Sequence, residues 1–144
     1  MANTFIEIYA DGSCSPNPGK GGYGIVMKYG DHIKEFKGSG IGTETNNTME
    51  LKAVINALRL LTRSDIPVFV YTDSNYVVQG MTVWGINWKK NGFKGIKNKQ
   101  LWIDLFQLAE QFEIGWEWVK GHNGHALNER ADELANEGRL LNEQ

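Results

Sequence analysis

"IPVFVYTD", residues 66–73, is the stretch that decides the fold. It is a short, continuous apolar run that ends at an acidic residue, Asp73. A run of this kind is typical of a central strand that is buried on both faces of a sheet. The sequence therefore predicts an α/β protein, with a ligand site expected where this strand ends.

The segments on either side of this strand complete a mixed α/β pattern. Alternation in "TFIEIYADG" (residues 4–12) predicts a first strand, and "GYGIVMKYGDHIKEFKGSGI" (residues 22–41) predicts two more around a tight turn at Gly30-Asp31. "EIGWEWV" (residues 113–119) predicts a fifth strand. Four helical segments are expected, over residues 46–62, about 74–91, about 99–112 and 128–141. Together they predict one domain, residues 1–144, with a mixed sheet.

The composition describes a globular protein of moderate charge. The chain has 144 residues, of which 41% are hydrophobic and 22% charged, and its formal net charge is −2. No apolar run approaches the roughly 18 residues of a membrane span, and the first residues lack the basic region of a secretory signal. The single cysteine, Cys14, excludes an internal disulfide and suits a reducing compartment. We therefore expect a cytoplasmic monomer without a membrane partner.

One segment carries far more positive charge than this balance predicts. "NWKKNGFKGIKNKQLW" (residues 87–102) holds five lysines and three aromatic residues, and no Asp or Glu occurs from Ser74 to Ile103. Such a block is typical of a surface that contacts nucleic-acid phosphates. The alternative is a solvated basic loop whose aromatic residues belong to the core, as we also expect in part for Trp116 and Trp118.

A glycine-rich motif suggests a nucleotide site that the following residues do not support. "GKGGYG" (residues 19–24) matches the G-x-G-x-x-G pattern of dinucleotide-binding loops. In those loops a helix follows, and its N-terminus holds the pyrophosphate, whereas here "IVMKYG" predicts a strand. We interpret the motif as a turn between strands, in a loop whose backbone can still approach a ligand closely.

Four carboxylates stand at the ends of elements that must pack around one sheet: Asp11, Glu50, Asp73 and Asp132. Three of them have ordinary structural explanations. Asp11 fits an Asp-Gly turn, Glu50 fits a capping box with Asn47, and Asp73 fits a helix cap. Asp132 lies beside an apolar stripe, and no Lys or Arg stands three or four residues away from it.

If these four carboxylates converge, they repel one another unless a divalent cation lies between them. Oxygen ligands of this kind suit Mg²⁺ or Mn²⁺. One cysteine and three histidines do not supply a zinc site. His122 and His125 lie in a glycine-containing loop before the last helix, for which Asn128 is a candidate cap. An imidazole beside a metal site is well suited to proton transfer near neutral pH.

Five motifs occur in an order that resembles the bacterial ribonuclease HI family. They extend from about residue 5 to residue 138 and are "YADGSCSPNPGKGGYG", "TNNTMELKAVINAL", "VYTDSNYVVQG", "NWKKNGFK" and "WEWVKGHNGHALNERADELA". The resemblance implies the ribonuclease H-like fold, a five-stranded mixed sheet whose first three strands are antiparallel and which is flanked by helices. It implies an endonuclease that hydrolyses the RNA strand of RNA–DNA hybrids and leaves 5′-phosphate and 3′-hydroxyl ends.

The resemblance also implies a pair of Mg²⁺ ions as cofactors, with Mn²⁺ able to substitute. In that scheme Asp11 bridges the ions, and Asp132 holds the ion that activates the attacking water. Glu50 and Asp73 hold the ion that stabilises the leaving 3′-oxygen. Two ions placed in this way can clamp both oxygens of an in-line displacement.

Further residues are implied to assist the reaction or to bind the hybrid. His122 assists proton transfer or product release, and Glu129 lies nearby in the same segment. RNA is distinguished by its 2′-hydroxyl. The implied RNA-side contacts are Glu50 itself and Cys14, Asn17, Thr45, Asn46, Asn47 and Asn75. The basic block is implied to hold the DNA strand by phosphate and sugar contacts that carry no sequence information. Its contact residues are Trp84, Trp88, Lys89, Lys90, Phe93, Lys94, Lys97 and Asn98.

Two departures and two alternatives accompany this interpretation. Thr43 and Thr48 occupy positions that are often arginine in close relatives, which predicts a weaker phosphate-binding pocket on the DNA side unless lysines compensate. The alternatives are a non-catalytic module that binds RNA–DNA hybrids through the basic block, and a DNA-directed nuclease of the same fold. Mg²⁺-dependent cleavage of a labelled hybrid, compared with duplex DNA, separates the three.

Overall fold

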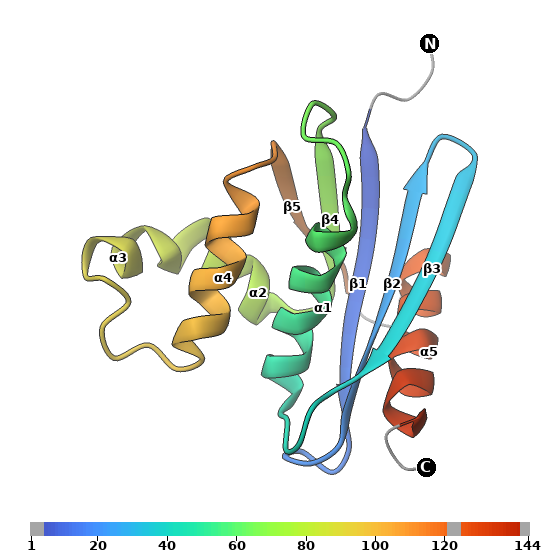
Figure 1. Cartoon of the computed structure of the whole chain (residues 1–144), viewed down its shortest axis with the longest axis horizontal. Helices are drawn as coiled ribbons and strands as arrows, with labels where there is room; N and C mark the ends of the chain where they lie inside the picture. The colour runs from blue at the N-terminus through green and yellow to red at the C-terminus, as the bar shows by residue number, and fades with distance from the viewer. Residues whose placement is uncertain (1–4, 121–124, 142–144) are drawn as a thin grey trace.

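A five-stranded mixed sheet forms the centre of the protein, and the computed structural model describes residues 5–120 and 125–141. In spatial order the strands are β3-β2-β1-β4-β5 (Figure 1). Their bounds are β1 Ile6–Cys14, β2 Gly21–Tyr29, β3 His32–Ser39, β4 Val68–Thr72 and β5 Ile114–Trp118. The pairs β1–β2 and β2–β3 are antiparallel, and β1–β4 and β4–β5 are parallel. The predicted sheet is confirmed, with β4 as an interior strand and β1 in the middle.

Helices cover both faces of this sheet. α5 (Ala126–Leu141) lies on one face, and α1 (Asn46–Leu60) and α4 (Lys99–Ala109) lie on the other (Figure 1). Between β4 and α4 the chain forms α2 (Asn75–Gln79), a π-helical turn η1 (Gly80–Trp84) and α3 (Gly85–Lys90). Of the helices in the described residues, none combines the length and apolarity that a membrane crossing requires.

Alternation along β1 divides the core between the two helical layers. Ile8 and Ala10 are buried in the larger cluster, which also contains the buried side chains of α1 and α4. Tyr9 points to the opposite face and packs against a smaller cluster formed with α5, namely Val26, Ala131 and Leu134. Because side chains alternate along a strand, Asp11 shares the α5 face with Tyr9.

The first turn of α1 is capped by threonines instead of the predicted pair of Asn47 and Glu50. Thr45 is the N-cap, and its hydroxyl accepts the backbone N–H of Thr48 at 3.1 Å. The Thr48 hydroxyl in turn accepts the backbone N–H of Thr45 at 2.8 Å. Thr48 thus takes the place of the Glu or Gln that usually completes a capping box. The predicted box is wrong, and Glu50 has no capping role.

Two other predicted helix caps are also wrong. Ser74 caps α2, and its hydroxyl accepts the backbone N–H of Val77 at 3.2 Å. Asp73 therefore lies outside the helix and is available for other contacts. α5 already begins at Ala126, so Asn128 lies inside the helix, where it is buried.

The helical segments predicted over about residues 74–91 are observed as α2, η1 and α3, and the π-helical turn η1 lies where the chain packs around a buried indole. Trp102 of α4 has no exposed surface, and a Cβ atom at Gly80 would lie 2.1 Å from its ring. The indole Nε1–H of Trp102 donates to the hydroxyl of Tyr76 at 3.0 Å. Trp102 therefore joins the segment that projects away from the sheet, α2 to α3, to the core (Figure 1).

We expect Trp102→Ala to lower the free energy of unfolding by about 3–5 kcal/mol, because it removes a fully buried indole and leaves a cavity. Urea denaturation measures this loss. Ile86→Ala is the control, since Ile86 lies on α3 but is 61% exposed. It should change stability by no more than about 0.5 kcal/mol. A loss below about 1 kcal/mol for Trp102→Ala would contradict the anchoring role of this residue.

Candidate active site

Three carboxylates from separate elements meet at one edge of the sheet. Asp11 comes from β1, Glu50 from the second turn of α1, and Asp73 from the position directly after β4. One oxygen of each lies within 4.8 Å of the others, so that the three side chains can hold one cation between them. Asp11 is only 3% exposed, and Glu50 and Asp73 are half-buried.

The register of two parallel strands brings Asp11 and Asp73 together. Tyr9 of β1 stands opposite Tyr71 of β4, and their rings stack with centroids 4.8 Å apart. Asp11 follows Tyr9 by two residues in β1, and Asp73 follows Tyr71 by two residues just past the end of β4, so this register brings the two carboxylates close together. Asp11 lies inside β1, which continues to Cys14, so the predicted Asp-Gly turn is wrong.

Gly12 lets α1 approach β1 closely enough for Glu50 to join these two carboxylates. A Cβ atom at this position would lie 2.4 Å from the backbone carbon of Met49. The backbone N–H of Gly12 donates to Oε1 of Glu50 at 2.6 Å, which fixes the carboxylate beside Asp11. The glycine that follows Asp11 is therefore required for contact between a strand and a helix.

A second glycine, Gly24, gives α5 the same close approach from the other side. Gly24 pairs with Asp11 across β1 and β2, and a Cβ atom there would lie 2.2 Å from the carbonyl oxygen of Ala131. Asp132 follows Ala131 and is half-buried. It lies near enough to Asp11 to affect its pKa by hydrogen bonding and charge, although it is outside the 4.8 Å group.

Burial and mutual repulsion make the charged forms of these carboxylates unfavourable. Burial raises the pKa of Asp11 strongly, and the charges of Glu50, Asp73 and Asp132 and a hydrogen bond with Asp132 raise it further. Burial also raises the pKa of Glu50 well above its ordinary value, and the charge of Asp73 adds to this, although the N–H of Gly12 opposes the shift. Both carboxyls therefore favour the protonated form unless positive charge is supplied.

The part of the chain that the structure describes supplies no Lys or Arg partner to the four acids. Its ion pairs use other carboxylates, namely those of Glu35, Glu44, Asp65, Glu133 and Glu137. The donor set at the edge consists of carboxylate oxygens, which suit a hard divalent cation such as Mg²⁺, Mn²⁺ or Ca²⁺. The residues present thus fit a metal site.

The residues expected on the RNA side lie around the first turn of α1 and the loop after β1. Cys14 is buried, and its thiol lies 3.2 Å from the carbonyl oxygens of both Pro16 and Glu44, so its side chain faces inward. The Oδ1 of Asn17 accepts the backbone N–H of Asn46 at 3.1 Å, which joins the loop to α1. Thr45 is half-buried as the N-cap, and four of the residues have exposed side chains: Asn17, Asn46, Asn47 and Asn75.

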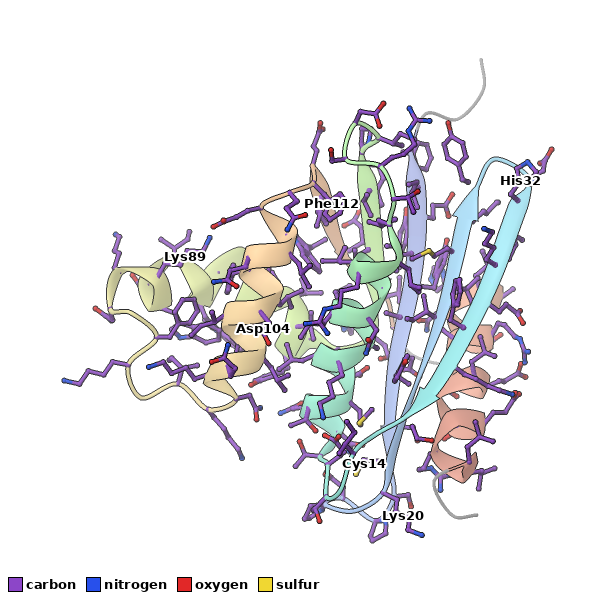
Figure 2. All side chains as sticks on the ribbon, in the orientation of Figure 1. Cys14, Lys20, His32, Lys89, Asp104 and Phe112 are labelled. Carbon is purple, nitrogen blue, oxygen red and sulfur yellow. The ribbon has the colours of Figure 1, made fainter. Side chains whose placement is uncertain are left out.

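The basic block combines exposed lysines with aromatic residues that belong partly to the core. All of its lysines are exposed, namely Lys89, Lys90, Lys94, Lys97 and Lys99. Figure 2 shows Lys89 on the projecting helix, far from the hairpin that carries His32. The Nζ atom of Lys89 lies 4.4 Å from the centre of the Phe106 ring. The lysine surface is consistent with phosphate contacts.

The aromatic residues of this region differ in exposure. Trp84 is 39% exposed, whereas Trp88 and Phe93 are half-buried and pack against the main core. The Nδ2 of Asn98 donates to the Tyr76 hydroxyl at 3.1 Å, which makes it part of the same packing. The exposed lysines thus fit a surface that contacts phosphates, whereas most of the aromatic residues belong to the core, as the alternative interpretation expects.

Of the residues expected to assist the reaction, His122 lies outside the described residues. Glu129 is exposed in the first turn of α5. Trp116 packs partly against the core as expected, but Trp118 is 52% exposed, and its Nε1–H donates to the carbonyl oxygen of Asp73 at 3.1 Å. Sequence reasoning missed this contact, since an aromatic residue at the end of a strand gives no sign of its partner.

The chain is similar to known ribonucleases over nearly its whole length. The RNase H family matches residues 3–139. Ribonuclease H of Afipia carboxidovorans is 52% identical over 138 residues, which cover 92% of this chain and 91% of that protein. Ribonuclease HI of Neisseria meningitidis serogroup A is 49% identical over 141 residues, which cover 94% of this chain and 96% of that protein.

Two solved structures are also similar to this chain. LC9-RNase H1, described as a type 1 RNase H with the type 2 active-site motif, has a TM-score of 0.86 and 32% identity, over 97% of this chain and 74% of that one. LC11-RNase H1, solved in complex with an RNA/DNA hybrid, has a TM-score of 0.75 and 26% identity, over 96% of this chain and 99% of that one.

The sheet order and the carboxylate edge fit an α/β enzyme that binds a divalent cation. The sequence matches narrow this class further: the chain belongs to the ribonuclease H family. It is an endoribonuclease, and the activity of its family is cleavage of the RNA strand of RNA–DNA hybrids.

Without metal, the contribution of Asp11 and Glu50 to the stability of the protein should fall as the pH rises above about 4, because both have higher pKa values when folded than when unfolded. The stability that these two carboxyls contribute is fully present below the pKa of the unfolded state. It is lost as the pH rises toward the pKa of the folded state. We expect Asp11→Asn to stabilise the metal-free protein at pH 8 by at least about 1.4 kcal/mol, the equivalent of one pKa unit.

Thermal unfolding in EDTA from pH 4 to pH 9 measures this effect, and added Mg²⁺ should raise the wild-type Tm more than that of the variant. Asp31→Asn is the control, since Asp31 is exposed at the hairpin turn. A lower Tm for Asp11→Asn than for wild type at pH 8 in EDTA would contradict the proposed repulsion.

Proposed function

We propose that the protein cuts the RNA strand of RNA–DNA hybrids with two Mg²⁺ ions held by Asp11, Glu50, Asp73 and Asp132, and that Mn²⁺ can replace Mg²⁺. The observation that supports this most directly is the group of three carboxylate oxygens within 4.8 Å of one another, with no Lys or Arg paired to them in the described residues. Bound divalent cations supply Lewis-acid stabilisation of charge on the phosphoryl, attacking and leaving oxygens.

Asp11 is the shared ligand in this proposal. It lies within the 4.8 Å group with Glu50 and Asp73, and these two residues and Asp132 all affect its pKa. Glu50 is held by Gly12, and Asp73 is held through its carbonyl by the indole of Trp118. The chain thereby fixes the carboxylates before substrate arrives, so that little reorganisation is needed during the reaction.

The hybrid would lie with its two strands on different parts of the protein. RNA would be recognised through hydrogen bonds to 2′-hydroxyl groups by the residues of the loop after β1, the first turn of α1 and the start of α2. DNA phosphates would be held by the lysines of the basic block, and Trp84, which is exposed just before the block, would lie against the sugars or line the DNA channel. His122 and Glu129 remain our candidates for proton transfer and product release.

We also propose that residues 1–144 act as one domain and as a cytoplasmic monomer. Cys14 supports a reducing compartment, because it is a free cysteine whose buried thiol is hydrogen-bonded to the carbonyl oxygen of Glu44.

Asp11→Asn should lower cleavage of a labelled RNA–DNA hybrid at least about 10³-fold, which corresponds to ~4 kcal/mol of transition-state stabilisation. Hybrid binding should remain measurable, because the lysine surface is unchanged. A cleavage assay in Mg²⁺, Mn²⁺ and EDTA, with a binding assay in Ca²⁺, measures both properties. Asp31→Asn is again the control and should cleave like wild type.

Full activity of Asp11→Asn would refute the metal assignment. Wild-type cleavage of duplex DNA in preference to the hybrid would favour the DNA-directed nuclease. Hybrid binding without cleavage under any of these metals would favour the non-catalytic module.

Replacing Lys89, Lys90, Lys94 and Lys97 by Ala should raise the KM for the hybrid more than it lowers kcat, because phosphate contacts position the substrate and take no part in bond breaking. The slope of log Kd against log salt concentration should become shallower by up to about 3 to 4. Each phosphate contact that is lost reduces the number of counterions that the nucleic acid releases on binding. The control replaces Lys34 and Lys37 on β3, the edge strand remote from α3 (Figure 1). An unchanged salt slope in the fourfold variant would contradict this role of the block.

A further inference from the structure

Glu44 is a buried carboxylate that belongs to no part of the metal site. It lies in the loop between β3 and α1 and is 3% exposed. Its Oε2 accepts the backbone N–H of Ile41 at 2.8 Å and the ammonium group of Lys52, and its Oε1 accepts the hydroxyl of Thr48 at 2.8 Å. Three donors therefore satisfy the charge, as burial of an ion requires.

The backbone of Glu44 holds a second loop. Its N–H donates to the carbonyl oxygen of Gly19 at 2.7 Å, and its own carbonyl accepts the N–H of Gly19 at 2.9 Å. The same carbonyl lies 3.2 Å from the thiol sulfur of Cys14. The loop that follows β1 is thus tied to the loop that precedes α1 through one residue. Figure 2 shows Cys14 and Lys20 together at the end of the molecule where α1 begins.

Glu44 also fixes the first turns of α1 through one face of that helix. Thr48 and Lys52 are four residues apart and so lie on the same face, whereas Glu50, midway between them, points away from it. Glu50 has its own anchor in the N–H of Gly12, and its neighbours Met49 and Leu51 are fully buried. Loss of the Glu44 contacts should therefore loosen the two loops and leave the metal ligand in place.

The segments that Glu44 joins carry the residues proposed to contact RNA. Asn17 lies in the loop after β1, and Thr45, Asn46 and Asn47 begin α1. Three of these, Asn17, Asn46 and Asn47, are exposed, so their side chains obtain little order from packing. A loop that is ordered before binding avoids an entropic cost that a loose loop must meet when the substrate arrives.

We propose that the ion pair of Glu44 and Lys52 is a positioning device that orders the RNA-contacting loops for hybrid binding, an inference that rests on the proposed function. Lys52 is committed to this pair, so it does not replace a phosphate-binding arginine, and the Thr48 hydroxyl is likewise occupied by Thr45 and Glu44. The pair acts on substrate affinity, and the carboxylates of the metal site act on the chemical step.

The test compares Glu44→Gln, Lys52→Met and the double variant in steady-state cleavage of a hybrid, at a temperature well below each Tm. Each single variant should raise KM about tenfold, or ~1.4 kcal/mol, and leave kcat and the Mg²⁺ dependence within about twofold of wild type. The double variant should recover part of the Tm that Lys52→Met loses, because it no longer leaves a buried carboxylate unpaired. Glu137→Gln on α5 is the matched control, since it breaks exposed pairs with Lys37 of β3 and Arg130 of α5.

If KM for both single variants stays within about twofold of wild type while wild type cleaves the hybrid, the positioning role is refuted. A fall in kcat without a rise in KM also refutes it, because the pair would then act on the metal site. Absence of cleavage by wild type is a different result, which refutes the proposed function. Thermal unfolding of the four proteins gives the coupling between Glu44 and Lys52 independently of activity, and a coupling near zero would contradict the inferred pair.

Discussion

Repulsion among carboxylates that the fold forces together is the constraint on which the remaining structure depends. Asp11 and Asp73 are brought close together by the parallel pairing of β1 with β4, and Glu50 is held beside Asp11 by the backbone N–H of Gly12. Such an arrangement is unfavourable for the folded chain alone, so the rest of the molecule must hold it in place. The metal site is thus a region where stability is given up for function.

Two glycines beside Asp11 decide how that edge is built. Gly12 admits α1 and Gly24 admits α5, each at a distance that a side chain would prevent. Because α1 and α5 approach from opposite faces of the sheet, Asp11 of β1 lies near Glu50 of α1 and near Asp132 of α5. The glycine-rich stretch that imitates a nucleotide loop therefore has a packing function: Gly24 is its last residue and lies across from Asp11.

Much of this arrangement could be predicted from the sequence, because strand and helix periodicity and the order of the motifs carry the fold. All five strands and the helix over residues 46–62 were expected at nearly their observed bounds. The caps at Thr45 and Ser74 could not be predicted, since several adjacent residues can cap equally well. The π-helical turn at Gly80 packs against the distant Trp102, and the tether of Asp73 depends on Trp118, so local sequence patterns do not contain either contact.

The carboxylate edge draws on elements that are far apart in the sequence, since Asp11 lies in β1 and Asp132 lies in α5. A polypeptide still emerging from the ribosome, without α5, has a partly formed edge that lacks one proposed ligand and leaves β1 uncovered on that face. Nucleolytic competence would then arrive only after α5 has been synthesised and has docked on the sheet.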